Sequence, residues 1–338
     1  MRGSDGQVTV RSFLRAVAWK AEAGASRTSS GALWEPRGGG RIWVVNPDHD
    51  SVAVIDAVTR QRIREIPVGQ RPRSLAQASN GDIWVVNQQD ASISIIQADT
   101  LTLRRSVSLP SHSQPYGLVF TPLGQAYVAL EATGVLLQLS ADGSTTGALA
   151  VGPSPRHLGL SADGQQLLVS AFITPALPGE HTAVVGTQDA GRPVGGQVQR
   201  VDVARFERAA TLVLAHSERS DSEAQGRGFP NYLGAPVFSP DGRSAWVPSK
   251  QDNLRRGSLR DGRALDFQNT VRAISSRIST TGAPGTWAED LEARVDHDNA
   301  SLTSALIFHP SGAFAFAALE TSRQVAVFDP YRQRELFR

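Results

Sequence analysis

The chain has 338 residues, contains no cysteine and carries a formal net charge of +2. The lack of cysteine excludes disulfides, thiolate metal sites and covalent c-type haem within this chain. The small net charge argues against a general nucleic-acid binder, and no apolar run reaches the ~18 residues of a membrane span. We therefore expect a folded protein with no nucleic-acid partner and no membrane span.

The first 30 residues contain one short apolar run, Phe13 to Trp19, which Arg15 interrupts. No convincing cleavage site follows it, so we predict no signal peptide. Residues 1–30 are interpreted as an N-terminal remnant or extension that could supply strands to a closing blade.

From residue 31 onward the chain repeats itself. The segment Trp43-Val44-Val45-Asn46 returns as Trp84-Val85-Val86-Asn87, an offset of 41 residues. Each copy follows a glycine turn, and the best formed turn is Ser-Pro-Asp-Gly at 239–242, where proline presets one residue and glycine accepts a positive φ. Weaker copies lie at 126–130, 166–170, 244–248 and 313–317.

Alternating segments such as Ser51-Val52-Ala53-Val54-Ile55-Asp56 follow each copy, and their period of two indicates strands. Four short strands in about 41 residues are typical of a propeller blade. We predict an all-β fold, with a β-propeller of four-stranded blades over residues 31–338. Six blades are recognisable; either these six close a ring, or the chain is a seven-bladed type that is incomplete here.

Four long connections interrupt the repeat, at 172–196, 215–231, 250–269 and 279–301. Neighbouring strands are antiparallel, so connections from second to third strands and between blades share one face. We assign all four insertions to that face. Insertions gathered on one face mark a binding face.

The insertion at 250–269 is the most cationic loop. Its arginines could hold a carboxylate, a phosphate or an acidic partner surface. The alternative is a solvated loop whose charges pair with one another. The partner-binding candidates are Lys250, Asp252, Asn253, Arg255, Arg256, Arg260 and Asp261.

A second polar cluster, Asp296-His297-Asp298-Asn299, directly precedes a predicted innermost strand and should lie near the channel mouth. Oxygen and imidazole ligands at this spacing suit Ca²⁺ or another divalent metal. The alternative is turn chemistry, because Asp and Asn hydrogen-bond their own backbone. We assign no catalytic residue.

The repeat, with Trp-Val-Val-Asn at 43–46 and 84–87 and Ser-Pro-Asp-Gly at 239–242, resembles the YVTN-type β-propeller repeat of the lactonase-like superfamily. The segments 247–253, 260–262 and 269–274 are similar to bacterial propellers joined to a di-haem cytochrome c peroxidase-like domain. This resemblance implies a periplasmic or extracellular location. It also implies a haem on a downstream part or a separate polypeptide, because this chain without cysteine cannot carry the covalent haems of that family.

Two hypotheses follow. The first is a non-catalytic binding or scaffold module of a bacterial envelope redox protein, which docks a protein partner, such as a haem-containing domain or subunit, through the insertion-bearing face. The second is a metal-assisted lactone hydrolase with Asp296, His297 and Asp298 as ligands or bases at the channel mouth.

Overall fold

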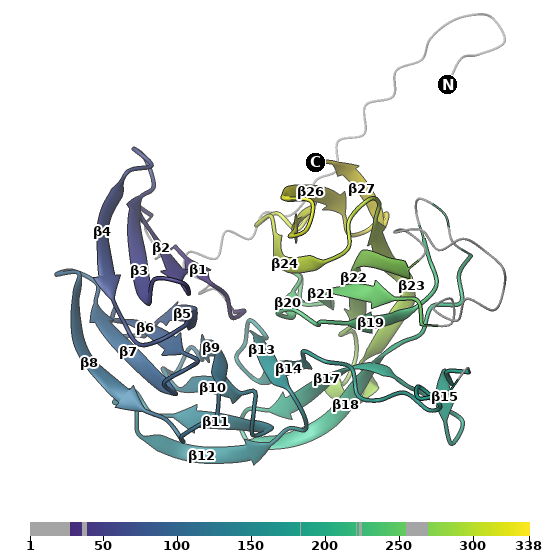
Figure 1. Ribbon diagram of the computed structural model, residues 1–338, viewed down its shortest axis with the longest axis horizontal. Coiled ribbons are helices and arrows are strands. Elements are labelled where there is room, and N and C mark those ends of the chain that lie inside the picture. Colours follow the sequence, from purple (N-terminus) through teal and green to yellow (C-terminus); the bar gives the residue numbers. More distant parts are fainter. Residues whose placement is uncertain (1–27, 36–38, 183, 221, 223–224, 255–269) are drawn as a thin grey trace, which may run out of the picture.

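The computed structural model describes residues 28–35, 39–182, 184–220, 222, 225–254 and 270–338. Within these ranges the protein is all-β apart from one 3-10 turn, η2 (Pro284–Thr286). Six blades follow one another around a propeller, as predicted (Figure 1). In each blade, neighbouring strands of the sheet pair antiparallel, and the first strand lies innermost.

The first three blades are regular four-stranded sheets. Blade 1 contains β1 (Leu33–Trp34), β2 (Arg41–Asn46), β3 (Ser51–Asp56) and β4 (Arg62–Pro67). Blade 2 contains β5 (Pro72–Gln77), β6 (Ile83–Asn87), β7 (Ser92–Gln97) and β8 (Thr102–Ser108). Blade 3 contains β9 (Pro115–Phe120), β10 (Ala126–Leu130), β11 (Val135–Leu139) and β12 (Thr145–Ala150).

The next two blades carry the insertions. Blade 4 contains β13 (Pro155–Leu160), β14 (Gln166–Ala171), β17 (Gly195–Asp202) and β18 (Glu207–Ala215). Blade 5 contains β19 (Phe229–Asn231) and β20 (Val237–Phe238), which both pair with β21 (Ser244–Asp252), then β22 (Val271–Ser279) and β23 (Ala288–His297). Blade 6 contains β24 (Thr303–Phe308), β25 (Ala315–Leu319), β26 (Gln324–Asp329) and β27 (Arg334–Phe337).

The repeated Trp-Val-Val-Asn segment forms the second strand of its blade, where both faces are covered. Trp84 is buried against blade 3, and its ring meets Phe120 edge-on at 5.1 Å. Ile83 and Val85, on the opposite face of β6, pack against blade 1. Because successive side chains of a strand point to opposite faces, blade 2 has two apolar faces. One packs against blade 1 and the other against blade 3.

Five apolar clusters hold the blades together, each between two consecutive blades. Among the described residues, no such cluster joins blade 6 to blade 1, and these two blades lie apart (Figure 1). Their facing sides leave Leu33, Ile307 and Val325 about half exposed. The predicted seventh blade remains a prediction, and the part assigned to residues 1–27 lies outside the described residues.

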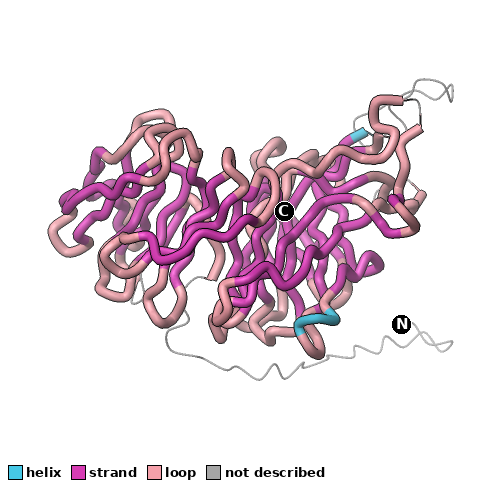
Figure 2. The backbone as a smooth tube through the Cα atoms, turned by 90° about the horizontal axis from the view of Figure 1, so that it is seen from below, coloured by secondary structure: helices cyan, strands magenta, loops and turns pink. Residues whose placement is uncertain are grey.

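Two of the long connections have the predicted position. Residues 172–194 link the second and third strands of blade 4 and contain the small hairpin of β15 (Gln188–Asp189) and β16 (Arg192–Pro193). Residues 216–228 link blade 4 to blade 5. The connection from β21 to β22 also leaves this face, although residues 255–269 lie outside the described residues. The hairpin of β15 and β16 projects outward from the ring of blades (Figure 1), and strands make up most of the described chain (Figure 2).

The prediction for 279–301 was wrong. Residues 288–297 form the fourth strand of blade 5, and the connection that precedes them lies at the opposite end, where Thr280 Oγ1 donates a hydrogen bond to Gly242 O. The strand was missed because it is rich in charged residues. Paired partners allow these to be buried, as in the 2.6 Å ion pair of Arg294 with Glu289.

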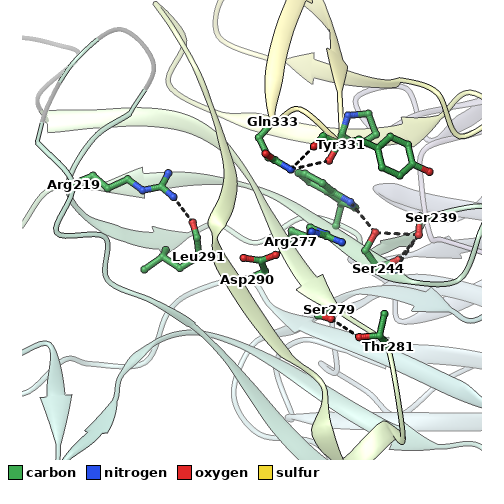
Figure 3. Close-up of polar contacts among 12 residues, drawn as sticks. Arg219, Ser239, Ser244, Arg277, Ser279, Thr281, Asp290, Leu291, Tyr331 and Gln333 are labelled. Carbon is green, nitrogen blue, oxygen red and sulfur yellow. Dashed lines mark hydrogen bonds and ion pairs between the residues drawn. The ribbon is translucent and has the colours of Figure 1, made fainter. Parts of the chain in front are cut away.

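The Ser-Pro-Asp-Gly turn forms as predicted at that opposite end. Gly242 has φ +66°, and Ser239 Oγ donates to Ser244 O at 2.9 Å. Ser244 Oγ in turn accepts a hydrogen bond from Trp246 Nε1, and Arg277 pairs with Asp290 nearby (Figure 3). The turn thereby fixes the start of β21.

Candidate binding site at the channel mouth

The insertion-bearing face is the end of the propeller where second strands join third strands and each blade joins the next. Of the predicted partner-binding residues, Lys250 and Asp252 end β21 on this face, and Asn253 follows them. Asn253 is buried, and its backbone N–H donates to Thr270 O at 2.9 Å. The predicted residues Arg255, Arg256, Arg260 and Asp261 lie outside the described residues.

Lys250 is engaged on two sides. Its Nζ lies 3.1 Å from Asp252 Oδ1 and 4.0 Å from the centroid of the Tyr232 ring. Asn231 Nδ2 donates to the other carboxylate oxygen of Asp252 at 2.9 Å. The ammonium group is therefore held over the aromatic face while it remains partly accessible.

A continuous row of cations and aromatic rings extends from this lysine across the channel mouth. Phe172 stacks on Tyr232, with centroids 4.6 Å apart and planes within 18°. Arg156 Cζ lies 3.2 Å from the centroid of Phe172 and 4.8 Å from that of Tyr116. Arg73 Cζ lies 5.6 Å from Tyr116. We call Arg73, Tyr116, Arg156, Phe172, Tyr232 and Lys250 the cation–aromatic ladder.

The Glu131 carboxylate, which directly follows the second strand of blade 3, is bonded to the ladder. Glu131 accepts a short hydrogen bond from Arg156 Nη2 and a 3.3 Å bond from Gln88 Nε2. Gln88 Oε1 accepts from Arg73 Nε at 2.7 Å. These bonds orient Arg73 and Arg156. Among the described contacts, Arg156 forms an ion pair with a carboxylate, whereas Arg73 donates to the amide oxygen of Gln88.

The ladder arises from the repeat itself. Three innermost strands begin with proline, and the next residues, Arg73, Tyr116 and Arg156, occupy equivalent places in successive blades. The residue before each proline has a positive φ: Arg71 at 53°, Gln114 at 50° and Ser154 at 51°. The equivalent second-strand residues Trp84, Tyr127, Leu168 and Trp246 are each followed, four positions later, by Gln88, Glu131, Phe172 and Lys250.

The sequence analysis missed these ladder residues except Lys250. The spaced dipeptides Pro72-Arg73, Pro115-Tyr116 and Pro155-Arg156 were the available signal. Residues at the same position near the start of each innermost strand lie at the same end of the channel in every blade. Their side chains can therefore meet there.

A surface pocket of about 580 Å³ lies beside the ladder between blades 3 and 4. Glu131 belongs to both the pocket wall and the ladder network. The other lining residues are Gln114, Ala132, Thr133, Gly134, Ala150, Gly152, Pro153 and Ser154.

His157 lies beneath the ladder, edge-on to Tyr116 at 4.9 Å. Burial, together with the positive charge of Arg156, lowers the pKa of His157 to about 3. The imidazole is therefore neutral at physiological pH, and it adds no cation to the site.

The predicted metal ligands Asp296, His297 and Asp298 each contact different side chains. Asp296 pairs with Arg272 at 3.4 Å, and burial raises the pKa of the Asp296 carboxyl despite the surrounding cations. His297 instead contacts Ser275 at 3.1 Å and Glu335 at 3.1 Å. Asp298 Oδ2 accepts a hydrogen bond from the neighbouring side-chain amide, Asn299 Nδ2, at 3.1 Å.

Over the described ranges, no group of three His, Asp or Glu side chains is arranged to hold a metal ion. Successive residues of a strand point to opposite faces, which separates Asp296 from His297. Metal binding by Asp296, His297, Asp298 and Asn299 remains a prediction.

Blades 4 and 5 are joined behind the site by buried charges. Glu289 accepts from the backbone N–H of Ala215 at 2.6 Å, and Arg294 Nη2 donates to Ala215 O at 2.8 Å. Arg294 Nη1 donates to Gln251 at 2.8 Å. Arg219, in the connection that follows, donates to Leu291 O at 2.7 Å (Figure 3). The insertion that begins at residue 216 is thus anchored to β23.

No protein-family model matches the sequence, and no curated protein matches it. Solved structures do match. Hydrazine synthase from Kuenenia stuttgartiensis is 16% identical with a TM-score of 0.68, covering 94% of this chain and 80% of that chain. The periplasmic gluconolactonase of Pseudomonas aeruginosa is 17% identical with a TM-score of 0.63, covering 90% and 83%.

A putative 6-phosphogluconolactonase from Bacteroides fragilis is 16% identical with a TM-score of 0.61, covering 90% of this chain and 82% of that one. At these identities the likeness establishes the fold alone, a β-propeller. In the described part of the chain, no helix has the length and apolar character required to cross a bilayer.

Proposed function

We propose that this protein is a binding propeller that docks an acidic protein partner through its insertion-bearing face. The observation that carries the proposal is the cation–aromatic ladder, which places three cations and three rings in one row across blades 2 to 5. Aromatic and arginine side chains are enriched at protein interfaces and dominate their binding energy.

The partner class follows from the sequence resemblance. A haem-containing domain or subunit of a bacterial envelope redox protein would present carboxylates, from acidic side chains or haem propionates, to Arg73, Arg156 and Lys250. Guanidinium groups bind carboxylates through paired hydrogen bonds. A periplasmic or extracellular location belongs to the same proposal, and the likeness to a periplasmic gluconolactonase supports it.

The test is binding of a purified di-haem c-type cytochrome peroxidase, followed by calorimetry at two salt concentrations. We expect Lys250→Ala to weaken binding about tenfold, the equivalent of ~1.4 kcal/mol. Arg243→Ala is the matched control, because Arg243 lies in the β20–β21 turn at the opposite end. Equal affinity of both variants and the parent chain would refute docking at this face.

Lactone hydrolysis is the second candidate. Two lactonase-like neighbours support it, as do the ion pair of Arg156 with Glu131 of the pocket wall and the His157 ring, which contacts Tyr116. An arginine there could stabilise the oxyanion that forms when water attacks the lactone carbonyl, and a neutral imidazole or carboxylate could accept the proton from water.

Turnover of glucono-1,5-lactone, measured by proton release with and without added Ca²⁺, distinguishes the candidates. Hydrolysis above the spontaneous rate that Glu131→Gln abolishes would favour the lactonase. A spontaneous rate only, with and without the metal, would leave binding as the function.

A further inference from the structure

The segment Thr28–Trp34 lies along the inside of the propeller and ends as β1, the first strand of blade 1. Ser30 N–H donates to Leu158 O at 2.8 Å, and Leu160 N–H donates to Thr28 O at 2.5 Å. Ser29 stands opposite Gly159 in an antiparallel bridge. These bonds attach the segment to β13, the innermost strand of blade 4.

The same segment then contacts the first two blades. Gly31 O accepts from Leu75 N–H of blade 2 at 3.1 Å, and Ala32 O accepts from Val45 N–H of blade 1 at 3.0 Å. Leu33 and Trp34 continue as β1. Seven residues thus connect blades 4, 2 and 1 through backbone hydrogen bonds.

The innermost strand of a blade has one edge without a strand partner, and such an edge can accept an extended peptide. The backbone N–H groups of Leu158 and Leu160, on the edge of β13 away from β14, donate hydrogen bonds to this segment. Their acceptors are Ser30 Oγ (2.9 Å) and Thr28 O. Small residues suit the position, because Ser29 and Ser30 are almost completely buried.

Glycines make room for this crossing. A Cβ atom on Gly117 of blade 3 would lie 3.2 Å from Ser30 Oγ and 2.5 Å from Arg156 O. A Cβ atom on Gly159 would lie 2.1 Å from Pro236 O of blade 5. The inner strands therefore approach closely only because these two positions lack a side chain.

We infer that the inner edge of blade 4, at Leu158–Leu160, is a strand-docking site whose occupant is residues 28–32 of the same chain. The docked segment links blades 1 and 2 to blade 4 through backbone hydrogen bonds, whereas among the described residues no apolar cluster joins blade 1 to blade 6. This inference is independent of what binds at the insertion-bearing face.

The first test uses the full chain with Ser30→Pro, which removes the N–H that Leu158 O accepts. We expect its melting temperature to fall by at least about 2 °C more than that of Ser30→Ala, which loses only the Oγ contact. A synthetic peptide of residues 28–34 should bind the Ser30→Pro chain and restore its melting temperature. It should not bind the parent chain, whose edge is occupied.

Equal melting temperatures for the two variants, or a peptide that binds the parent and the proline variant alike, would overturn the inference. Hydrogen exchange on the unaltered chain provides a measurement that needs no variant. The Leu158 and Leu160 amides should exchange as slowly as the hydrogen-bonded backbone amides of β14. Exchange at the rate of exposed amides would also overturn the inference.

Discussion

The guanidinium of Arg156 lies between the rings of Tyr116 and Phe172, only 3.2 Å from the Phe172 centroid. Arg156 lies in the first strand of blade 4, and Phe172 directly follows the second strand of the same blade. The contact of Arg156 with Tyr116 joins the regular blade 3 to the insertion-bearing blade 4.

Phe172→Leu should weaken docking of the haem protein, because leucine keeps apolar volume but provides no ring for Arg156 or Tyr232. A cation–π contact contributes ~0.5–2 kcal/mol, so we expect a loss of about 2- to 30-fold by calorimetry. Phe314→Leu is the control, since Phe314 packs on His309 at the opposite end. Equal losses for both variants would show that the ladder has no specific part in docking.

Arg294→Met should destabilise the fold strongly, because it leaves the buried Glu289 carboxylate without its cation. Breaking such a pair costs ~3–5 kcal/mol in the free energy of unfolding, measured with urea. The double variant Arg294→Met, Glu289→Gln should recover part of this loss. Arg62→Met, at an exposed pair, should cost less than about 1 kcal/mol. A small effect at Arg294 would show that this pair does not hold blades 4 and 5 together.

Acid should destabilise the protein partly through His157. Its pKa is about 3 in the fold against about 6.5 in the unfolded chain, so the unfolded state binds more protons between these values. Stability is thus complete above about pH 6.5 and decreases as the pH falls toward 3. His157→Gln should flatten the dependence of melting temperature on pH across this range. An unchanged slope would assign the acid sensitivity to other groups.

Gly159→Ala should destabilise the propeller, since the new methyl group would meet Pro236 O at 2.1 Å. Overpacking of this kind costs ~1–3 kcal/mol. Gly285→Ala is a suitable control, because a Cβ atom there meets nothing within 4 Å. Thermal unfolding of both variants checks the prediction, which fails if their melting temperatures agree.

The blades could be predicted from sequence because each is a local unit: the Trp43 and Trp84 segments repeat with the same glycine turn and the same alternation. Blade 5 was harder, because its fourth strand buries Arg294 and Asp296 against partners that are distant in sequence, Gln251 and Ala215 for Arg294 and Arg272 for Asp296. The ladder was missed for a related reason. Its contacts join residues from different repeats, and Phe172 has no sequence feature that links it to Arg156.

The positive φ at Arg71, Gln114 and Ser154 has a consequence for how such a surface can change over evolution. The backbone bends in the same way before each proline, whichever side chain follows, so arginine and tyrosine occupy that place equally well. The apolar clusters between blades lie elsewhere along the strands and do not depend on this choice. Single substitutions at the three positions can therefore change the charge and shape of this face without disturbing the packing that holds the propeller together.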